Sequence, residues 1–231
     1  MENLTNQDLH FVVSRLPKDL VVGIKNHKLI VAGGFIRETI SGGKVSDIDL
    51  FGQSVDTLKL AALELAQDRK GRMFNTDNAI TVLSPPRLPI QFITKWLFTE
   101  PSLCVDSFDF TVCQAGIWWD GENWQSTISP AFYPDLAAKR LVYTYPVRIE
   151  AAGGSMLRVR KFLQRGYSIQ SASLAGVIAR LCGSIDFRRG YDEKDAAKII
   201  TALLREVDPL TVVDGVDLLD EHEVVAQEAK P

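Results

Sequence analysis

The stretch VAGGFIRETISGGKVSDIDLFG, residues 31–52, decides the fold. It combines a double glycine, Gly33 and Gly34, with two acids, Asp47 and Asp49, that are separated by a single residue. The apolar run before the glycines predicts a buried strand, and FIRETIS after them predicts a short helix. SDIDLFG then predicts a second strand. This order of strand, glycine turn, helix and acidic strand predicts an α/β layer that binds a charged ligand.

The two acids need a positive partner. Side chains alternate along a strand, so Asp47 and Asp49 point to the same face, roughly 6.5 Å apart at a rise of about 3.3 Å per residue. Two carboxylates at that spacing repel each other. Mg²⁺ binds oxygen ligands, usually one or two carboxylates plus substrate phosphates, and a pair of such ions can drive an in-line displacement. The acids therefore predict Mg²⁺ in one or two copies, and a solvated strand face is the alternative.

The glycine turn suits an anion. Gly33 and Gly34 let backbone N–H groups face outward at a helix start, where the helix dipole favours negative charge. Arg37 lies one turn into that helix, where it either neutralises phosphate or braces the acids. The pattern therefore predicts a triphosphate at the turn and the metal of that triphosphate at the acids.

Composition excludes several classes of protein. The chain has 231 residues, 46% apolar and 24% charged, with a formal charge of -3, so any basic surface that binds nucleic acid must be local. Cys104, Cys113 and Cys182 lack the spacing of zinc ligands, which predicts buried thiols in a reducing compartment, the cytoplasm. The N-terminus does not resemble a signal peptide, and no apolar stretch is long enough to span a bilayer. A membrane partner is therefore not expected.

The periodicity of apolar residues divides the chain into two structured parts and a tail. Helices are expected over 6–27 and 54–70, and strand patterns dominate from about 79 to 128, with a helical piece near 100–107. Helical patterns then follow at four places: 134–142, 154–166, 171–183 and 192–208. We therefore predict three regions: a head domain at 1–146, a small helical domain at 147–208 and an acidic C-terminal tail at 209–231.

Four segments, taken in order, resemble the DNA polymerase β nucleotidyltransferase superfamily. The resemblance is closest to the head and neck of tRNA CCA-adding enzymes and bacterial poly(A) polymerases. The segments are GGFIRETISGGKVSDIDLFG at 33–52, SFDFTVCQA at 107–115, PDLAAKRLVY at 134–143 and MLRVRKFLQRGYSI at 156–169. The resemblance implies an α+β fold, a nucleotidyltransferase-type mixed sheet with flanking helices followed by a small helical domain. It also implies that Asp47 and Asp49 bind metal, and that Gly33, Gly34 and Arg37 bind nucleotide phosphates.

The chain departs from the family pattern at two acidic positions. Glu38 stands where the family often has Asp, and Gln91 in LPIQFITK stands where a third carboxylate is common. Neutral glutamine binds Mg²⁺ more weakly than a carboxylate does, so either metal binding is reduced or another acid substitutes.

Asp109, with Asp106 behind it, is the best candidate for the missing acid, although the arginines of the family's RRD are replaced by Ser107 and Phe108. On the strand expected from 108 onward, Asp109 shares a face with Thr111 and Cys113. In this role Asp109 is expected to position or deprotonate the acceptor hydroxyl. The alternative is a buried Asp bonded to backbone or to an Arg.

A basic segment follows the head. Between Ser155 and Gly190 a single acid, Asp186, accompanies seven basic residues: Arg158, Arg160, Lys161, Arg165, Arg180, Arg188 and Arg189. Arg158, Lys161 and Arg165 share one helix stripe, which either follows a phosphate backbone, holds the incoming triphosphate or is a solvated helix face. From this stripe we assign Arg158 and Lys161 to nucleotide binding.

Two functions follow. The first is a nucleotidyltransferase that moves a nucleoside monophosphate from a nucleoside triphosphate such as ATP to an acceptor hydroxyl, in the manner of tRNA processing at an RNA 3′ end, and releases pyrophosphate. A protein or a small molecule is an alternative acceptor. The second is a non-catalytic RNA- or nucleotide-binding module with a degenerate head. Gln91 favours the second function, and the intact Asp47 and Asp49 favour the first.

Overall fold

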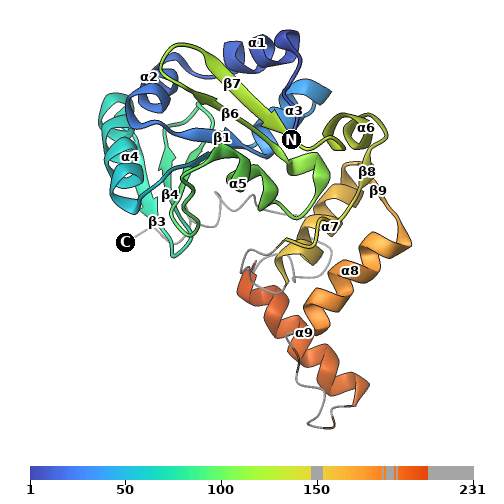
Figure 1. Ribbon diagram of the computed structural model, residues 1–231. Helices are drawn as coiled ribbons and strands as arrows, with labels where there is room; N and C mark the ends of the chain where they lie inside the picture. Colours follow the sequence, from blue (N-terminus) through green and yellow to red (C-terminus); the bar gives the residue numbers. More distant parts are fainter. Residues whose placement is uncertain (147–152, 184, 186–189, 191, 208–231) are drawn as a thin grey trace. The chain divides into compact units, whose positions relative to one another are not determined.

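A computed structural model describes residues 1–146, 153–183, 185, 190 and 192–207 (Figure 1). The contacts between Cα atoms divide the chain into two units, Met1–Ala137 and Ala138–Pro231. The predicted boundaries at 146 and 208 remain predictions. The acidic tail expected at 209–231 lies outside the described residues, as do Asp186, Arg188 and Arg189 of the basic segment.

The first unit is built on a mixed sheet. Among the described residues it has seven strands in the order β3-β4-β5-β2-β1-β6-β7. Its neighbouring strands are antiparallel except for β2 and β5, which run parallel. The strands are β1 (Ile30–Ala32), β2 (Ile48–Phe51), β3 (Arg72–Asn75), β4 (Ala79–Leu83), β5 (Ile90–Ile93), β6 (Ala115–Trp119) and β7 (Trp124–Ile128).

Helices of the first unit begin and end where the sequence provides the signals. Ser54 caps α4 by accepting a hydrogen bond from the backbone N–H of Thr57 at 3.1 Å. Gly42, at φ 71°, ends α3 in the left-handed conformation. The helices are α1 (Asn6–Arg15), α2 (Lys18–His27), α3 (Gly34–Ser41), α4 (Val55–Arg69), α5 (Pro101–Asp106), the 3₁₀ turn η1 (Thr111–Cys113) and α6 (Phe132–Ala137).

The two faces of the sheet are covered by different helices. Ile30 and Phe51 are opposite each other in register, so they share a face, and Cys104 of α5 packs against them. A side chain at Gly52, the next residue after Phe51, would meet Leu58 of α4. Successive residues point to opposite faces, so α4 lies across the sheet from α5 (Figure 1).

The N-terminus adds a short extension to the outermost strand. Glu2 pairs with Ile128 at the end of β7 through backbone hydrogen bonds of 2.9 and 2.8 Å. The backbone N–H of Leu4 then donates to the Ser126 hydroxyl at 3.0 Å. This pairing satisfies part of the β7 edge that faces away from β6.

The second unit is mainly helical. Its described elements are β8 (Arg140–Leu141), α7 (Gly154–Gln164), β9 (Ser168–Ile169), α8 (Ser171–Cys182) and α9 (Glu193–Val207). The three helices from 154 onward confirm the sequence prediction. The helix predicted over 134–142 is wrong in its second half. Lys139 adopts φ 47°, which ends the helical run, and β8 then pairs in parallel with β9. None of the described helices has the length and apolarity that crossing a membrane requires.

Candidate active site at the start of strand β2

The register of β1 and β2 brings the glycine turn and the acids to the same edge of the sheet. These strands are antiparallel, with Val31 opposite Leu50. The Gly33–Gly34 turn leaves β1 at the end where β2 starts, and Asp47 and Asp49 occupy that start. Neighbouring strands lie about 4.8 Å apart, so a ligand at the turn is within reach of both carboxylates. Both acids are half-buried, and Asp47 immediately precedes the strand.

Two structural features favour glycine at position 33. Its φ of 80° lies in a region that L side chains rarely adopt, and a Cβ there would lie 3.1 Å from the Phe108 ring. Its backbone N–H donates to the Ala115 carbonyl at 2.9 Å, which ties the turn to β6. As the N-cap of α3 it offers no side chain to the helix start. Gly33 therefore caps none of the first-turn N–H groups of α3, and N–H groups at a helix start are typical donors to an anion.

Arg37 is buried beneath this turn. The residue is only 5% exposed, and its Nε and Nη2 both lie 2.9 Å from Glu38 Oε1. Its Nη1 donates to Cys113 Sγ at 3.2 Å. A Cβ on Gly43 would overlap the Glu38 carboxylate, which explains a glycine after α3. The contact with Cys113 links α3 to η1. Both roles predicted for Arg37, a phosphate contact and bracing of Asp47 and Asp49, remain predictions.

Gln91 is the neighbour of Asp49 in the sheet. β2 and β5 are parallel with Asp49 opposite Gln91, and Gln91 is in turn opposite Thr81 on β4. Residues in register share a face, so a carboxylate, an amide and a hydroxyl form one row across three strands. The family pattern predicts that Gln91 takes the place of an acid beside the pair, and the register sets it beside Asp49. Thr81 was not anticipated, because nothing near it in sequence marks it.

The donor set fits a divalent cation that also binds substrate. The described residues contain no group of three or more His, Cys, Asp or Glu side chains suited to a metal ion. Two carboxylates next to a glycine turn at a helix start are nevertheless a set that Mg²⁺ uses when phosphates complete its coordination shell. Asp47 and Asp49 would hold such an ion.

Asp109 does not lie on a strand. The strand expected from residue 108 is wrong in its first part, since the chain forms a bend and then η1, and β6 starts only at Ala115. The Thr111 hydroxyl donates to the buried Asp135 carboxylate at 2.6 Å, and this contact favours the turn over an extended segment. Asp109 is 1% exposed, so it corresponds to the alternative of a buried Asp. Its role at the acceptor remains a prediction.

An aromatic cluster borders the glycine turn. The Phe108 ring meets Phe51 edge-to-face at 5.9 Å, and Phe51 meets Phe98 in the same way at 5.9 Å. Phe108 is half-buried next to Gly33. No local sequence pattern signals this apolar wall, because its members come from three separate segments.

The predicted basic stripe lies on α7 of the second unit. Arg158 and Lys161 are half-buried, whereas Arg165 is exposed. On the apolar side Phe162 is buried against Tyr167, with 5.0 Å between ring centroids, and Leu163 is 48% exposed. The stripe is thus anchored through Phe162 and presents basic groups at the surface of this unit.

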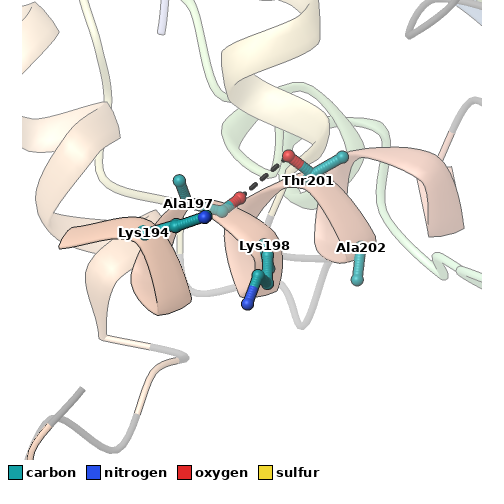
Figure 2. A pocket seen from close by; sticks show the side chains of 5 residues that line it. All are labelled: Lys194, Ala197, Lys198, Thr201 and Ala202. Atoms are coloured by element: carbon teal, nitrogen blue, oxygen red, sulfur yellow. Dashed lines mark hydrogen bonds between the residues drawn. The ribbon is translucent and has the colours of Figure 1, made fainter. Parts of the chain in front are cut away.

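Two hollows are lined by residues other than the acids. One, of about 620 Å³, is lined by five residues of α9: Lys194, Ala197, Lys198, Thr201 and Ala202 (Figure 2). The Thr201 hydroxyl donates to the Ala197 carbonyl at 2.8 Å, and Lys198 pairs with Asp195. All the lining residues belong to one helix and most are exposed, so the hollow is a feature of the helix surface rather than a formed site.

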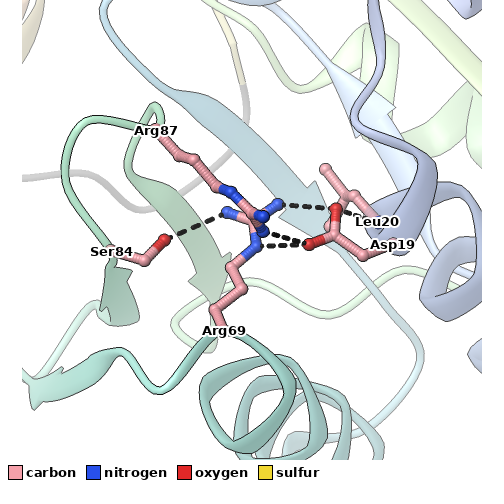
Figure 3. A network of polar contacts seen from close by, with 5 residues as sticks. All are labelled: Asp19, Leu20, Arg69, Ser84 and Arg87. Carbon is pink, nitrogen blue, oxygen red and sulfur yellow. Dashed lines mark hydrogen bonds and ion pairs between the residues drawn. The ribbon is translucent and has the colours of Figure 1, made fainter.

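The second hollow, of about 240 Å³, lies between α2 and α4 beside a polar network (Figure 3). Arg69 binds the Asp19 carboxylate through Nε at 2.8 Å and Nη2 at 3.0 Å, and Arg87 adds a contact at 2.8 Å. The hydrogen bond from Arg69 is the main reason that the pKa of Asp19 lies below its ordinary value of 3.8. Because this carboxylate is already held by two arginines, we interpret the network as a structural tie between α2, α4 and the turn after β4.

Comparison of the sequence with protein families identifies a family match. The model of a family described as "Gabija anti-defense 2 family protein" matches residues 3–139, which include every site residue of the first unit. A curated relative from Bacillus phage SPbetaL7, named Gabija anti-defense 2, is 23% identical over 163 residues. The aligned part is 71% of this chain and 40% of the relative, so the chain spans about two fifths of that protein's length.

Comparison of the fold with solved structures finds similarity to CCA-adding enzymes. The Thermotoga maritima CCA-adding enzyme complexed with tRNA_CCA matches with a TM-score of 0.56 and 17% identity, over 89% of this chain and 52% of that chain. A CCA-adding enzyme in complex with CTP matches with a TM-score of 0.56 and 16% identity, over 88% and 56%. The chain thus spans about half the length of these enzymes. The predicted nucleotidyltransferase fold class is confirmed, whereas the family match lies with Gabija anti-defense 2 rather than with the CCA-adding branch.

Proposed function

The chain belongs to the Gabija anti-defense 2 family, and from this premise we propose that it counters a defence as a metal-dependent nucleotidyltransferase. It transfers a nucleoside monophosphate from a nucleoside triphosphate to an acceptor hydroxyl and releases pyrophosphate. The fold shared with CCA-adding enzymes supports this reaction class, and the name of the phage relative supports the role against a defence.

One observation carries the proposal: the glycine turn and the acidic pair meet at the same edge of the sheet. The antiparallel register of β1 and β2 puts Gly33 and Gly34 beside Asp47 and Asp49. α3 begins at Gly34, directly after the positive φ of Gly33. A polyphosphate that binds the helix start therefore brings its metal-binding oxygens to the carboxylates.

The chain's own residues position the reaction. Asp47 and Asp49 would hold Mg²⁺, the N–H groups at the start of α3 would bind the outer phosphates, and Arg37 ties α3 to η1 through Cys113. When bound, Mg²⁺ neutralises charge on the phosphates and activates the attacking oxygen. The acceptor oxygen forms a bond to the α-phosphorus, the bond to the bridging oxygen breaks, and its electron pair leaves with pyrophosphate. The hydroxyl proton passes to solvent.

We propose an RNA 3′ end as the acceptor. The basic groups of α7, chiefly Arg158, Lys161 and Arg165, suit a phosphate backbone or the incoming triphosphate. A protein hydroxyl is the other acceptor that the test must separate, because the family is named for its action on a defence and not for RNA.

The test uses nucleoside triphosphates labelled at the α-phosphate. The full chain is incubated with Mg²⁺, each labelled triphosphate in turn, and extracts of cells with and without the Gabija defence. We expect label in RNA, lost with Asp49→Asn and retained with Asp77→Asn, an exposed acid in the turn between β3 and β4. Label in protein instead of RNA would show that the acceptor is a protein hydroxyl. Absence of label from every fraction would contradict the proposal.

A non-catalytic nucleotide-binding module is the second candidate, and one observation favours it. Gln91 offers an amide where a third carboxylate would complete a metal shell, opposite Asp49. Under this function the protein binds triphosphates with Mg²⁺ and leaves them intact. Binding without transfer to any acceptor, in Mg²⁺ or Mn²⁺, would support it.

A further inference from the structure

The row formed by Asp49, Gln91 and Thr81 bears on how many metal ions the site takes. These residues are in register on β2, β5 and β4, and together they contain a single negative charge. Asp47, just before β2, adds the second. We propose that the site holds one divalent ion per bound nucleotide, and that the neutral amide of Gln91 sets this number. The inference rests on the proposed function, since the ion enters with a triphosphate.

The number of carboxylates favours one ion. Two ions about 3.5–4 Å apart each need oxygen ligands from the protein as well as from the phosphates. Asp47 and Asp49 supply two carboxylates. Mg²⁺ is commonly held by one or two carboxylates plus substrate phosphates, so this pair serves one ion. The Gln91 amide oxygen is a weaker ligand, and its N–H groups favour an oxygen of the substrate over a cation.

Other acids do not replace the missing carboxylate. Glu38 is paired with Arg37 at 2.9 Å, and its carboxylate lies against Gly43. Asp109 is 1% exposed in the bend before η1, on no strand of the sheet. Within the described residues, no set of three acidic, histidine or cysteine side chains is grouped for a metal. Position 91 is therefore the place where one carboxylate would change the metal count.

The test counts bound ions directly. Mn²⁺ replaces Mg²⁺, and free Mn²⁺ is measured by its paramagnetic resonance signal in the presence of a triphosphate analogue with a methylene group between the α- and β-phosphorus atoms. We expect one bound Mn²⁺ per protein–nucleotide complex in the natural chain and two in Gln91→Glu. Gln91→Asn, which keeps the amide, stays at one. Gln53→Glu, which adds a carboxylate at an exposed position after β2, also stays at one.

Thermal unfolding provides a second measurement beside the number of bound Mn²⁺ ions. Three carboxylates at one edge repel each other, so without metal Gln91→Glu melts at a lower temperature than the natural chain, and Mn²⁺ with the analogue raises its Tm more. Two ions in the natural chain would overturn the inference while leaving the proposed function intact, and so would one ion in a folded Gln91→Glu. Failure of the natural chain to bind any analogue with Mn²⁺ would instead overturn the proposed function and this inference together.

Discussion

Asp49 on β2 stands directly opposite Gln91 on β5, across the one pair of described strands that run parallel within the seven-stranded sheet. Asp49 therefore has a neutral neighbour on this side, and Asp47 is the second acid at this edge. In the proposed site these two carboxylates supply the charge that attracts a cation. Removing either acid should consequently weaken metal binding, and Gln91→Glu should strengthen it.

Replacing Asp49 or Asp47 by Asn is expected to abolish transfer without harming the fold. Asn keeps the size of the side chain and removes only its charge, so each variant should still fold. Turnover should fall by about 100-fold or more, the order seen when a charge-stabilising group leaves an active site. Labelled-nucleotide transfer and urea unfolding measure the two effects. A variant with normal turnover would show that the acids have no part in the chemistry.

Replacing Gly33 by Ala is expected to destabilise the head. The residue has φ 80°, and its Cβ would lie 3.1 Å from Phe108, so about 1–3 kcal/mol of strain is expected. Triphosphate binding should weaken as well, because the start of α3 is displaced. Gly23→Ala is the matched control. Gly23 lies inside α2, and no atom is within 4 Å of the position that its Cβ would take, so Ala should stabilise by about 0.5–1 kcal/mol.

The Asp19–Arg69 pair should make stability depend on pH in the acid range. The hydrogen bond from Arg69 lowers the pKa of Asp19 in the folded state, so the pair stabilises the protein above the ordinary value of 3.8. This stabilisation is lost as the pH falls through the folded pKa. Asp19→Asn should cost about 1–3 kcal/mol at neutral pH, with a smaller difference in acid. Urea unfolding across this range, with Asp77→Asn as control, measures it; a difference that grows in acid would contradict the assignment.

Replacing Asp109 by Asn should affect the fold and leave metal binding unchanged. The residue is 1% exposed, and an amide there must find new acceptors for its N–H groups, at a cost of about 1–3 kcal/mol. Thermal unfolding and Mn²⁺ affinity separate the two effects. If the Tm stayed constant while Mn²⁺ binding disappeared, Asp109 would be a metal ligand; loss of transfer with normal Mn²⁺ binding would support its predicted role at the acceptor.

The salt dependence of RNA binding should show whether the basic stripe of α7 binds phosphates. If Arg158 and Lys161 bind phosphates of single-stranded RNA, Arg158→Ala combined with Lys161→Ala should reduce the slope of log K against log salt by about 0.7 for each phosphate that is no longer neutralised. Lys194→Ala on α9 is the control, since this exposed residue belongs to the hollow that we interpret as helix surface. An unchanged slope would leave the stripe as a solvated helix face.

Much of the fold was predictable because local signals determine it. Ser54 marks the start of α4, Gly42 marks the end of α3, and apolar periodicity marks the helices of the second unit. The segment before β6 was not predictable. Its turn is stabilised by the hydrogen bond between Thr111 and Asp135, residues far apart in sequence. Alternation of side chains alone cannot distinguish such a turn from a strand.

The arrangement of the candidate site was also partly predictable from the sequence. Gly33, Gly34, Asp47 and Asp49 form one local motif that needs only the pairing of consecutive strands. The row with Gln91 and Thr81 requires β2 to pair with β5 and skip β3 and β4, a long-range choice that no short pattern encodes. The resemblance to a known family pointed to position 91, and the sheet register then showed which acid it faces.

The hydrogen bonds between Glu2 and Ile128 have a practical consequence for handling the protein. They occupy donors and acceptors on an outermost strand that would otherwise serve as a template for another molecule. Trimming the first few residues, or fusing a bulky tag directly before them, would expose that template. Self-association in concentrated samples should then be the first sign of damage.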